Sequence, residues 1–450
     1  MRVDSCGTEK IGQWEMLPDT CLLHIFKYLS DNERSKAALV CHHWHNIMRM
    51  PCLWRCRSFH FSGHRSLKQS EYVAAEGYAE NLGVFLERLE VTVCPPRSMV
   101  VAQRLHSTIC ALLNALVRVK APLKSLSILR LELDRSSWDR GLRNVVVDKL
   151  IYFLLRSASR LNNICLNGMR IGTQLGFKLI SAIIQNQRSL SPLCGLSLDL
   201  RGFFSNSVPN HLNLNIPHML QQLQGLTHLG LSYSCLSDEL LLALSQSNRA
   251  RRYKYGRGNI LQRFSLFCTQ NEPHQQVVQG YSWATLVSSC PDLKVILTVE
   301  QVIDSQKLVR ILLPEIPIMV YNMTAFYSAD ENWNAKPLLR NMLPCYRHSL
   351  QSLTLDLSNR RKSLDDELLE LVNVCECLID LRIWAFLDVR TVGRLLHIRL
   401  TKKMSLNKIR VRIYTMAENT EEQEYQLKEV LSPFCYPPEL QFLAVICPFI

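Results

Sequence analysis

The sequence predicts an α/β fold in which three short N-terminal helices precede a long stack of strand–helix units. Within the first 60 residues, apolar side chains recur at three- and four-residue steps, which is the spacing of one helix face. From residue 86 onward a different pattern recurs (apolar, two residues, apolar, one residue, apolar), and its first six copies start 32 to 38 residues apart. Apolar residues make up 47% of the chain and charged residues 20%, so the chain can bury a large core.

The first predicted helix begins at Pro18 and Asp19. Proline fits the first turn of a helix, and an aspartate there complements the helix dipole. The apolar face of this helix consists of Leu22, Ile25, Phe26 and Leu29.

A second predicted helix opens with a capping box from Ser30 to Glu33 and runs to Met48 before Pro51 ends it. Its apolar side is formed by Ala37, Ala38, Cys41, Trp44 and Met48. Leu53-Trp54 begins a third short segment. A module of about 45 residues cannot bury a full core alone. It therefore needs a partner protein, or it caps the stack that follows.

The order and spacing of four short motifs in this module resemble an F-box. The motifs are Leu17-Pro18, Ile25-Phe26-x-x-Leu29, Val40-Cys41-x-x-Trp44 and Leu53-Trp54. The resemblance covers residues 14–60 and implies docking onto the Skp-type adaptor of a cullin–RING ubiquitin ligase. It assigns the adaptor-binding surface or its core to Leu17, Pro18, Ile25, Phe26, Leu29, Val40, Cys41, Trp44, Leu53 and Trp54. The sequence does not separate interface residues from core residues within this set.

The tract Cys41-His42-His43-Trp44-His45 has the composition of a metal site. However, the F-box pattern already accounts for Cys41 and Trp44, and no second pair of ligands lies close in sequence. We therefore predict no metal and no cofactor. The chain also lacks a phosphate-cradling glycine loop, a serine nucleophile elbow and a helical zinc-binding histidine pair, so we predict no catalytic residues.

The recurring pattern is typical of leucine-rich repeats, in which a short strand is followed by a helix. Its copies are Leu86/Leu89/Val91, Leu123/Leu126/Ile128, Leu161/Ile164/Leu166, Leu193/Leu196/Leu198, Leu226/Leu229/Leu231, Leu261/Phe264/Leu266, Leu350/Leu353/Leu355, Leu378/Leu381/Ile383, Leu406/Ile409/Val411 and Leu440/Leu443/Val445, with weaker candidates at Leu293 and Ile316. The usual asparagine after each strand is mostly missing, and Ser234 stands in its place in the best copy. We therefore predict a degenerate, helix-rich solenoid over residues 86–450, preceded by a linker or cap helix over residues 61–85. An unrelated α/β fold is the alternative.

Three further stretches resemble one group of F-box proteins with degenerate leucine-rich repeats. They are residues 237–241, 310–318 and 383–389. This resemblance implies that the C-terminal repeats recruit a target protein, and it does not name the target.

A candidate target surface lies in the late repeats. Strand side chains alternate, so Arg382, Trp384, Arg410 and Arg412 should point to the concave face of the solenoid. Arginine forks suit carboxylate or phosphate groups, so the predicted target is acidic or phosphorylated. The alternative is that Trp384 is a core residue and the arginines form a solvated face.

The chain carries 52 basic and 39 acidic residues, a net charge of +13, which favours acidic partners. A basic tract with tyrosines at residues 249–258 could stack on nucleic acid, but it reads as a solvated loop because no RNA-binding signature accompanies it. No apolar run reaches the length of about 18 residues that spans a bilayer, so we predict no membrane contact.

Residues 1–10 contain no apolar segment of a secretory signal, so the 17 cysteines are expected to be free thiols of an intracellular protein, cytoplasmic and/or nuclear. Together these observations predict a non-catalytic substrate receptor of an SCF-type ubiquitin ligase. The alternative is an F-box scaffold without ligase output, and a nucleic-acid-binding solenoid is a more distant third.

Overall fold

The computed structural model describes residue 14 and residues 17–62, 69–156, 161–188, 195–205, 209–223, 225–255, 260–272, 275–325, 334–401, 405–435 and 437–449. The chain divides into two compact units. Unit 1 comprises residues 1–127 and 137–161, and unit 2 comprises residues 128–136 and 162–450.

Unit 1 contains the N-terminal helices and the first strand–helix pairs. Its elements are α1 (Asp19–Phe26), α2 (Asp31–Ala37), α3 (His42–Met48), a 3₁₀ turn (Pro51–Leu53), β1 (Cys56–Phe61), α4 (Gln69–Leu82), β2 (Arg88–Val93), α5 (Met99–Arg118) and α6 (Arg140–Arg156). Strand β3 (Ser125–Leu129) begins in unit 1 and ends in unit 2.

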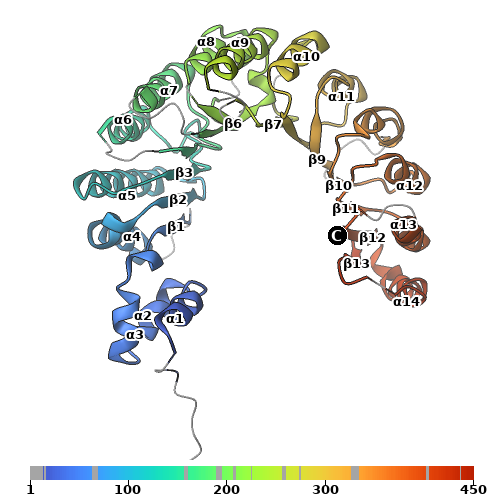
Figure 1. Cartoon of the computed structure of the whole chain (residues 1–450), viewed down its shortest axis with the longest axis horizontal. Helices are drawn as coiled ribbons and strands as arrows, with labels where there is room; N and C mark the ends of the chain where they lie inside the picture. The colour runs from blue at the N-terminus through green and yellow to red at the C-terminus, as the bar shows by residue number, and fades with distance from the viewer. Residues whose placement is uncertain are drawn as a thin grey trace, which may run out of the picture. The chain divides into compact units, whose positions relative to one another are not determined.

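Unit 2 alternates strands and helices along its whole length (Figure 1). Its elements are β4 (Asn163–Cys165), α7 (Thr173–Arg188), β5 (Leu196–Leu200), α8 (Asn215–Gln222), β6 (Leu226–Ser232), α9 (Asp238–Tyr255), β7 (Arg263–Thr269), α10 (Gly280–Ser289), β8 (Lys294–Glu300), α11 (Ser305–Ile311), β9 (Ile318–Ala325), a π-helical turn (Leu338–Met342), β10 (Ser352–Leu357), α12 (Asp365–Val374), β11 (Asp380–Ala385), α13 (Val389–Thr401), β12 (Lys408–Thr415), α14 (Thr420–Leu431) and β13 (Gln441–Pro448).

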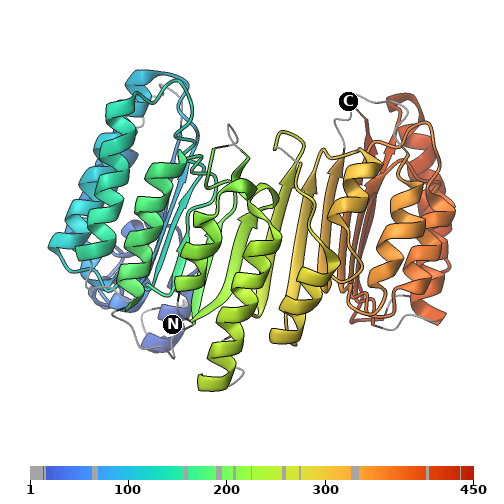
Figure 2. The ribbon, with the colours of Figure 1, turned by 90° about the horizontal axis from the view of Figure 1, so that it is seen from above.

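The strands of each unit are parallel and follow the order of the sequence. β1 pairs with β2 in unit 1, and β4 through β13 pair successively in unit 2. In unit 2, helices α7 to α14 cover one face of the sheet (Figures 1 and 2). In several strands every second residue is buried beneath them, as in β11, where Leu381, Ile383 and Ala385 are buried. The predicted fold class, N-terminal helices followed by a parallel strand–helix solenoid, is confirmed.

The structure differs from the sequence prediction in the second helix and in the start of the sheet. The helix predicted from Ser30 to Met48 is two helices, because the chain turns extended at Cys41, which caps α3. The capping box of Ser30 and Glu33 is present as predicted. Strand β1 lies before the predicted start of the repeats at residue 86, and α4 occupies most of the predicted linker.

The last predicted repeat is wrong by one residue. The pattern Leu440/Leu443/Val445 predicts that Leu443 and Val445 point into the core. Instead, Ala444 and Ile446 lie beside Val411 and Ile413, which are core residues of β12. Leu443 is accordingly 49% exposed. A slip of one residue exchanges the two faces of a strand, and the apolar residues of β13 occur on both parities.

Other groups take the place of the missing asparagines at the strand ends. Gly168 and Gly202 turn the chain with φ values of +72° and +60°, which glycine tolerates without strain. The N–H of Gly202 donates to Oγ of Ser232 at 2.8 Å. Asn359, one residue beyond the expected position, exchanges two hydrogen bonds of 2.8 Å with the backbone of Phe386 in the next repeat.

Glu272 makes the stability of unit 2 dependent on pH. Its side chain is 5% exposed, and its Oε2 accepts from the N–H of Ser234 at 3.3 Å. Burial raises the pKa of the Glu272 carboxyl from 4.5 to about 7. The folded state therefore holds this proton more tightly than the unfolded chain does. The stability that this group contributes is complete below about pH 4.5 and is lost as the pH rises to about 7.

We expect Glu272→Gln to remove this loss. Between pH 5.5 and pH 8 the wild type should lose about 2 kcal/mol of stability relative to the variant, since one pKa unit corresponds to about 1.4 kcal/mol. Urea unfolding of both proteins at the two pH values measures the difference. If the free energy of unfolding changed equally with pH in the two proteins, the raised pKa of Glu272 would be contradicted.

Helix α5 is, among the described residues, the one helix long and apolar enough to cross a bilayer by length and composition. Ten of its side chains, including Leu105, Ile109 and Leu112, are buried. It packs between α4 and α6 in unit 1, which is the environment of a core helix.

Candidate functional site

The N-terminal helices enclose a small apolar core. Its buried members are Leu22, Phe26, Ala37, Ile47, Met48 and Leu53. The ring of Trp44 packs edge-on against Phe26, with centroids 5.1 Å apart. Six buried side chains are few for independent stability, so polar contacts between the helices matter for this module.

The ten residues assigned to the adaptor-binding module fall into three classes. Phe26 and Leu53 are buried. Five are partly buried, namely Leu17, Leu29, Cys41, Trp44 and Trp54, and of these all but Cys41 pack against the core. Pro18, Ile25 and Val40 are exposed. These three side chains are therefore the members of the set that are available to a partner.

Two further apolar side chains of this module are strongly exposed. Tyr28 is 78% exposed and Leu39 is 85% exposed, beside Ile25 at 39% and Val40 at 60%. Tyr28 and Leu39 are not among the residues that the sequence pattern predicts for the partner surface. Both residues lie off the regular apolar stripes of the predicted helices. An apolar residue outside such a stripe is the feature of the sequence that could have predicted an exposed contact residue. We call Ile25, Tyr28, Leu39 and Val40 the exposed apolar set.

Arg34 of α2 joins α1, α2 and the turn at Leu53, although the sequence pattern does not predict a role for it. Its guanidinium donates to the carbonyl oxygens of Phe26 at 3.0 Å, Lys27 at 3.1 Å and Leu53 at 2.9 Å. It also lies over the ring of Trp54, 5.6 Å from the centroid. Its bonds to Phe26 and Lys27 reach two carbonyls at the end of α1, where few helical donors remain, although the Phe26 carbonyl also accepts from the N–H of Leu29 at 3.2 Å.

Trp54 joins the helical module to the first strand–helix pair of unit 1. Its indole N–H donates to the carbonyl of Met48 at 2.7 Å, and its own carbonyl accepts from the Tyr78 hydroxyl at 3.1 Å. The guanidinium of Arg57 on β1 lies 4.9 Å from the centroid of the Tyr78 ring. Burial raises the pKa of Tyr78 to about 12, so its hydroxyl remains a donor at physiological pH. These contacts tie the module to β1 and α4.

The residues of the histidine tract have local roles. The Cys41 sulfur accepts from the Trp44 N–H, His43 lies 3.4 Å from Asp19, and Nδ1 of His45 lies 3.3 Å from the carbonyl oxygen of Ala38. Within the described ranges no group of three or more His, Cys, Asp or Glu side chains is arranged to hold a metal ion. The cysteines of these ranges are free thiols, and several, such as Cys235 and Cys268, are buried.

The second candidate region lies on the face of the unit 2 sheet that carries no helices. Register pairs Arg382 with Arg410 and Trp384 with Arg412 on neighbouring strands β11 and β12. The Arg412 guanidinium stacks 5.0 Å from the centroid of the Trp384 ring. We call these four residues the arginine patch. Trp384 is partly buried and lies on the face opposite the core residues Leu381, Ile383 and Ala385.

The arginines of the patch differ in whether their guanidinium groups are already paired with a carboxylate. Arg382 donates to the carboxylate of Asp380 at 2.7 Å, whereas Arg410 and Arg412 are exposed. Strand β13 pairs with β12 one residue away from the predicted register. Leu443 therefore lies opposite Arg410, and Val445 lies opposite Arg412. The patch therefore combines two accessible guanidinium groups with apolar neighbours, a combination suited to a carboxylate or phosphate on a partly apolar segment.

Residues 249–255 of the basic tract are the last part of helix α9, not a loop, and residues 256–258 of the tract lie outside the described residues. Arg251 is partly buried and donates to the carbonyl of Leu223 at the end of α8. Burial lowers the pKa of Arg251. Tyr253 is 96% exposed. At least one cation of this tract thus has a structural role, so fewer cations of the tract are available to contact nucleic acid.

Residues 14–60 match the family model for F-box-like domains. F-box/LRR-repeat protein 21 from Ovis aries is 24% identical over 294 residues, which cover 63% of this chain and 59% of that protein. The Bos taurus protein of the same name gives the same values, and the Mus musculus protein is 22% identical over 292 residues. The match spans about 59% of the length of these relatives.

Among solved structures, the yeast complex of Rad7 and Elc1 contains a chain that aligns over 94% of this one and 92% of its own length, with 14% identity and a TM-score of 0.44. The chain thus carries an F-box-like domain followed by a strand–helix solenoid, and it is similar to F-box proteins with leucine-rich repeats.

Proposed function

We propose that this chain is the substrate-recognition subunit of an SCF-type cullin–RING ubiquitin ligase. The F-box-like domain would bind a Skp-type adaptor, and the solenoid would hold the target. The covalent chemistry would belong to other subunits, so the chain itself would be non-catalytic. It would act by holding a target lysine near the charged transfer enzyme.

The observation that carries this proposal is the exposed apolar set in a module with a family match. Isolated exposed apolar residues are normal on protein surfaces, but here four occur within 16 residues of one small domain. Ile25, Leu39 and Val40, with Pro18, would contact the adaptor. Phe26 and Leu53 would support this surface from the core.

Co-purification of the chain with co-expressed adaptor and cullin tests the proposal. Recovery of both subunits is the expected result. Recovery of the adaptor without cullin would favour an F-box scaffold without ligase output. A well-folded chain that recovers neither subunit would show that the N-terminal helices only cap the solenoid.

The arginine patch is the proposed target surface, and acidic or phosphorylated segments are its proposed ligands. We expect Arg410→Glu/Arg412→Glu to lose target proteins while retaining the adaptor, because two exposed cations become repulsive to an anion. Quantitative mass spectrometry of proteins that co-purify from cells measures the loss. Arg382 is left unchanged because its carboxylate partner Asp380 would be stranded.

A matched control uses Arg263→Glu/Lys294→Glu. These cations pair in register on β7 and β8 and are exposed on the same face of the sheet. The control should retain every target that the wild type retains. Equal losses from both variants would mean that total charge, not the arginine patch, selects targets.

Two finer assignments complete the proposal. The stretches at residues 237–241, 310–318 and 383–389 resemble F-box only protein 39 and its close relatives, and we propose membership of that group. We also propose an intracellular protein, cytoplasmic and/or nuclear, without membrane contact. Microscopy of the tagged full chain would test the location.

A further inference from the structure

A groove of about 600 Å³ lies on the helical face of unit 2, where α12, α13 and α14 adjoin. Its lining residues are Leu369 of α12, Arg390, Gly393, Arg394, His397 and Ile398 of α13, and Val430 and Phe434 at the end of α14. It lies on the opposite side of the sheet from the arginine patch. Its role is therefore independent of the target surface proposed above.

Helix α13 contributes a cationic row to the groove, formed by Arg390 and Arg394 and extended by the polar side chain of His397. Arg390, Arg394 and His397 follow one another at four- and three-residue steps, so they lie on one side of the helix. Two turns of helix separate the first from the last, a length of about 10 Å. All three side chains are exposed.

Gly393 lets the groove form between closely packed helices. A Cβ atom at this position would lie 2.9 Å from Cγ1 of Val430 and 3.7 Å from the ring of Phe434. The absence of a side chain allows α14 to approach α13. Leu369 and Ile398 supply further apolar lining, so the groove has an apolar lining beside a cationic row.

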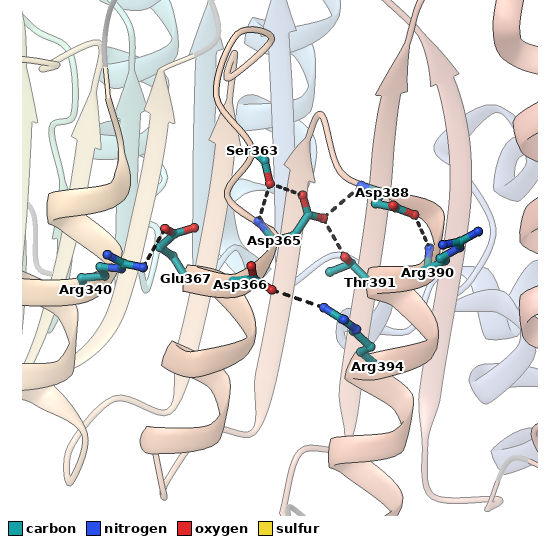
Figure 3. A network of polar contacts seen from close by, with 9 residues as sticks. All are labelled: Arg340, Ser363, Asp365, Asp366, Glu367, Asp388, Arg390, Thr391 and Arg394. Carbon is teal, nitrogen blue, oxygen red and sulfur yellow. Dashed lines mark hydrogen bonds and ion pairs between the residues drawn. The ribbon is translucent and has the colours of Figure 1, made fainter.

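A polar network holds the starts of α12 and α13 together (Figure 3). Oδ1 of Asp365 accepts from the N–H of Asp388 at 2.9 Å and from the Thr391 hydroxyl at 2.6 Å. On the other side of α12, Lys336 and Arg340 pair with the buried carboxylate of Glu367 at 2.9 and 3.2 Å. These contacts fix the α12–α13 side of the groove, which reduces the entropy cost of binding there.

The cationic row is only partly neutralised. Arg394 lies 3.3 Å from Asp366, and both side chains are largely exposed, so this pair is weak and can open (Figure 3). The Arg390 backbone N–H is bonded to Asp388 at 2.8 Å, while its guanidinium extends from the exposed side of α13 (Figure 3). Cations beside an apolar lining are complementary to a helix with acidic residues on one side and apolar residues on the next.

We propose that this groove binds an acidic amphipathic helix of a partner protein. Apolar side chains of that helix contact Leu369, Ile398, Val430 and Phe434. Its carboxylates, spaced by one helical turn, face Arg390, Arg394 and His397. The partner is distinct from the adaptor and from the target held by the arginine patch.

Fluorescence anisotropy with a designed peptide tests the proposal on the full chain bound to its adaptor, or on the full chain alone if no adaptor binds. The probe is a labelled, stapled 18-residue helix with leucines on one side and glutamates at adjoining positions one turn apart. The comparison peptide carries lysine in place of every glutamate. We expect saturable binding of the acidic peptide, at least about tenfold tighter than binding of the basic peptide, because the two differ only in charge.

Charge reversal of the groove provides the second arm. Arg390→Glu/Arg394→Glu should weaken the acidic peptide at least about tenfold and reverse the preference between the peptides. Arg263→Glu/Lys294→Glu, on the face of the unit 2 sheet that carries no helices, is the matched control and should leave acidic-peptide binding unchanged. Leu369→Ser, which keeps every charge, should also weaken the acidic peptide.

Several results would overturn the proposal. They are equal binding of the two peptides, unchanged binding to the groove variant, or equal losses in the groove variant and in its control. Analytical ultracentrifugation of the unliganded chain can give a further result of this kind. Self-association that Arg390→Glu/Arg394→Glu abolishes would assign the groove to a second copy of this chain. None of these results depends on whether the adaptor binds the F-box-like domain.

Discussion

Replacing Ile25 and Val40 with aspartate is expected to weaken adaptor binding at least about 100-fold while the N-terminal helices stay folded. Both side chains are exposed, so the substitutions remove little packing within the domain. In a complex they would place two carboxylates against an apolar partner surface, and burying unpaired charge there costs several kcal/mol. Isothermal titration calorimetry with purified adaptor measures the loss, and far-ultraviolet circular dichroism checks the helices.

Tyr72 and Phe26 supply comparisons for this experiment. Phe26→Ala should also reduce adaptor binding, but it should do so by loosening the core, with a loss of helix signal. Tyr72, which is buried against Phe61 in the first strand–helix pair, should tolerate Tyr72→Phe without change in adaptor binding. Full adaptor affinity in the Ile25→Asp/Val40→Asp variant would place the adaptor elsewhere on the chain.

Arg34→Ala is expected to melt the F-box-like domain selectively. Three hydrogen bonds from one guanidinium reach the end of α1 and the turn at Leu53, and their loss should cost about 2–4 kcal/mol. A domain with six buried apolar side chains has little stability in reserve. Limited proteolysis should cleave within α1 to α3 of the variant while the solenoid resists, and adaptor binding should fall with the folded fraction.

Two substitutions sharpen the Arg34 experiment. Arg34→Lys keeps the charge but loses the planar fork, so it should be nearly as destabilising as Arg34→Ala. Arg49→Ala, at an exposed arginine that ends α3, should have a small effect. If Arg34→Lys matched the wild type in proteolysis, charge alone and not the three directed bonds would stabilise the domain.

The joint around Trp54 bears on how the proposed ligase would work. The module is bonded to β1 and α4 through Trp54, Arg57 and Tyr78, so its orientation to the first strand–helix pair of unit 1 is defined by directed contacts. A receptor that acts by proximity benefits from such a defined orientation, since a loose joint would dilute the target around the transfer enzyme.

Local chemistry in the sequence was sufficient to predict the fold class and most of the elements. The Ser30–Glu33 capping box acts over three residues, and the strand pattern acts over six, so both are visible in a short window. The same regularity predicted that Arg382, Trp384, Arg410 and Arg412 share one face, because side chains alternate along a strand and neighbouring parallel strands pair in register.

Tertiary structure decided what depends on contacts between distant residues. Ile25 and Phe26 are adjacent on one apolar stripe, and only the packing of α3 against α1 determined that Phe26 is buried and Ile25 exposed. Arg34 reaches carbonyls up to 19 residues away, which no local pattern encodes. In β13 apolar residues occupy both faces, so periodicity does not decide which face is buried. Pairing with β12 places Ala444 and Ile446 on the core side, where Ile446 is buried, and leaves Leu443 beside the arginine patch.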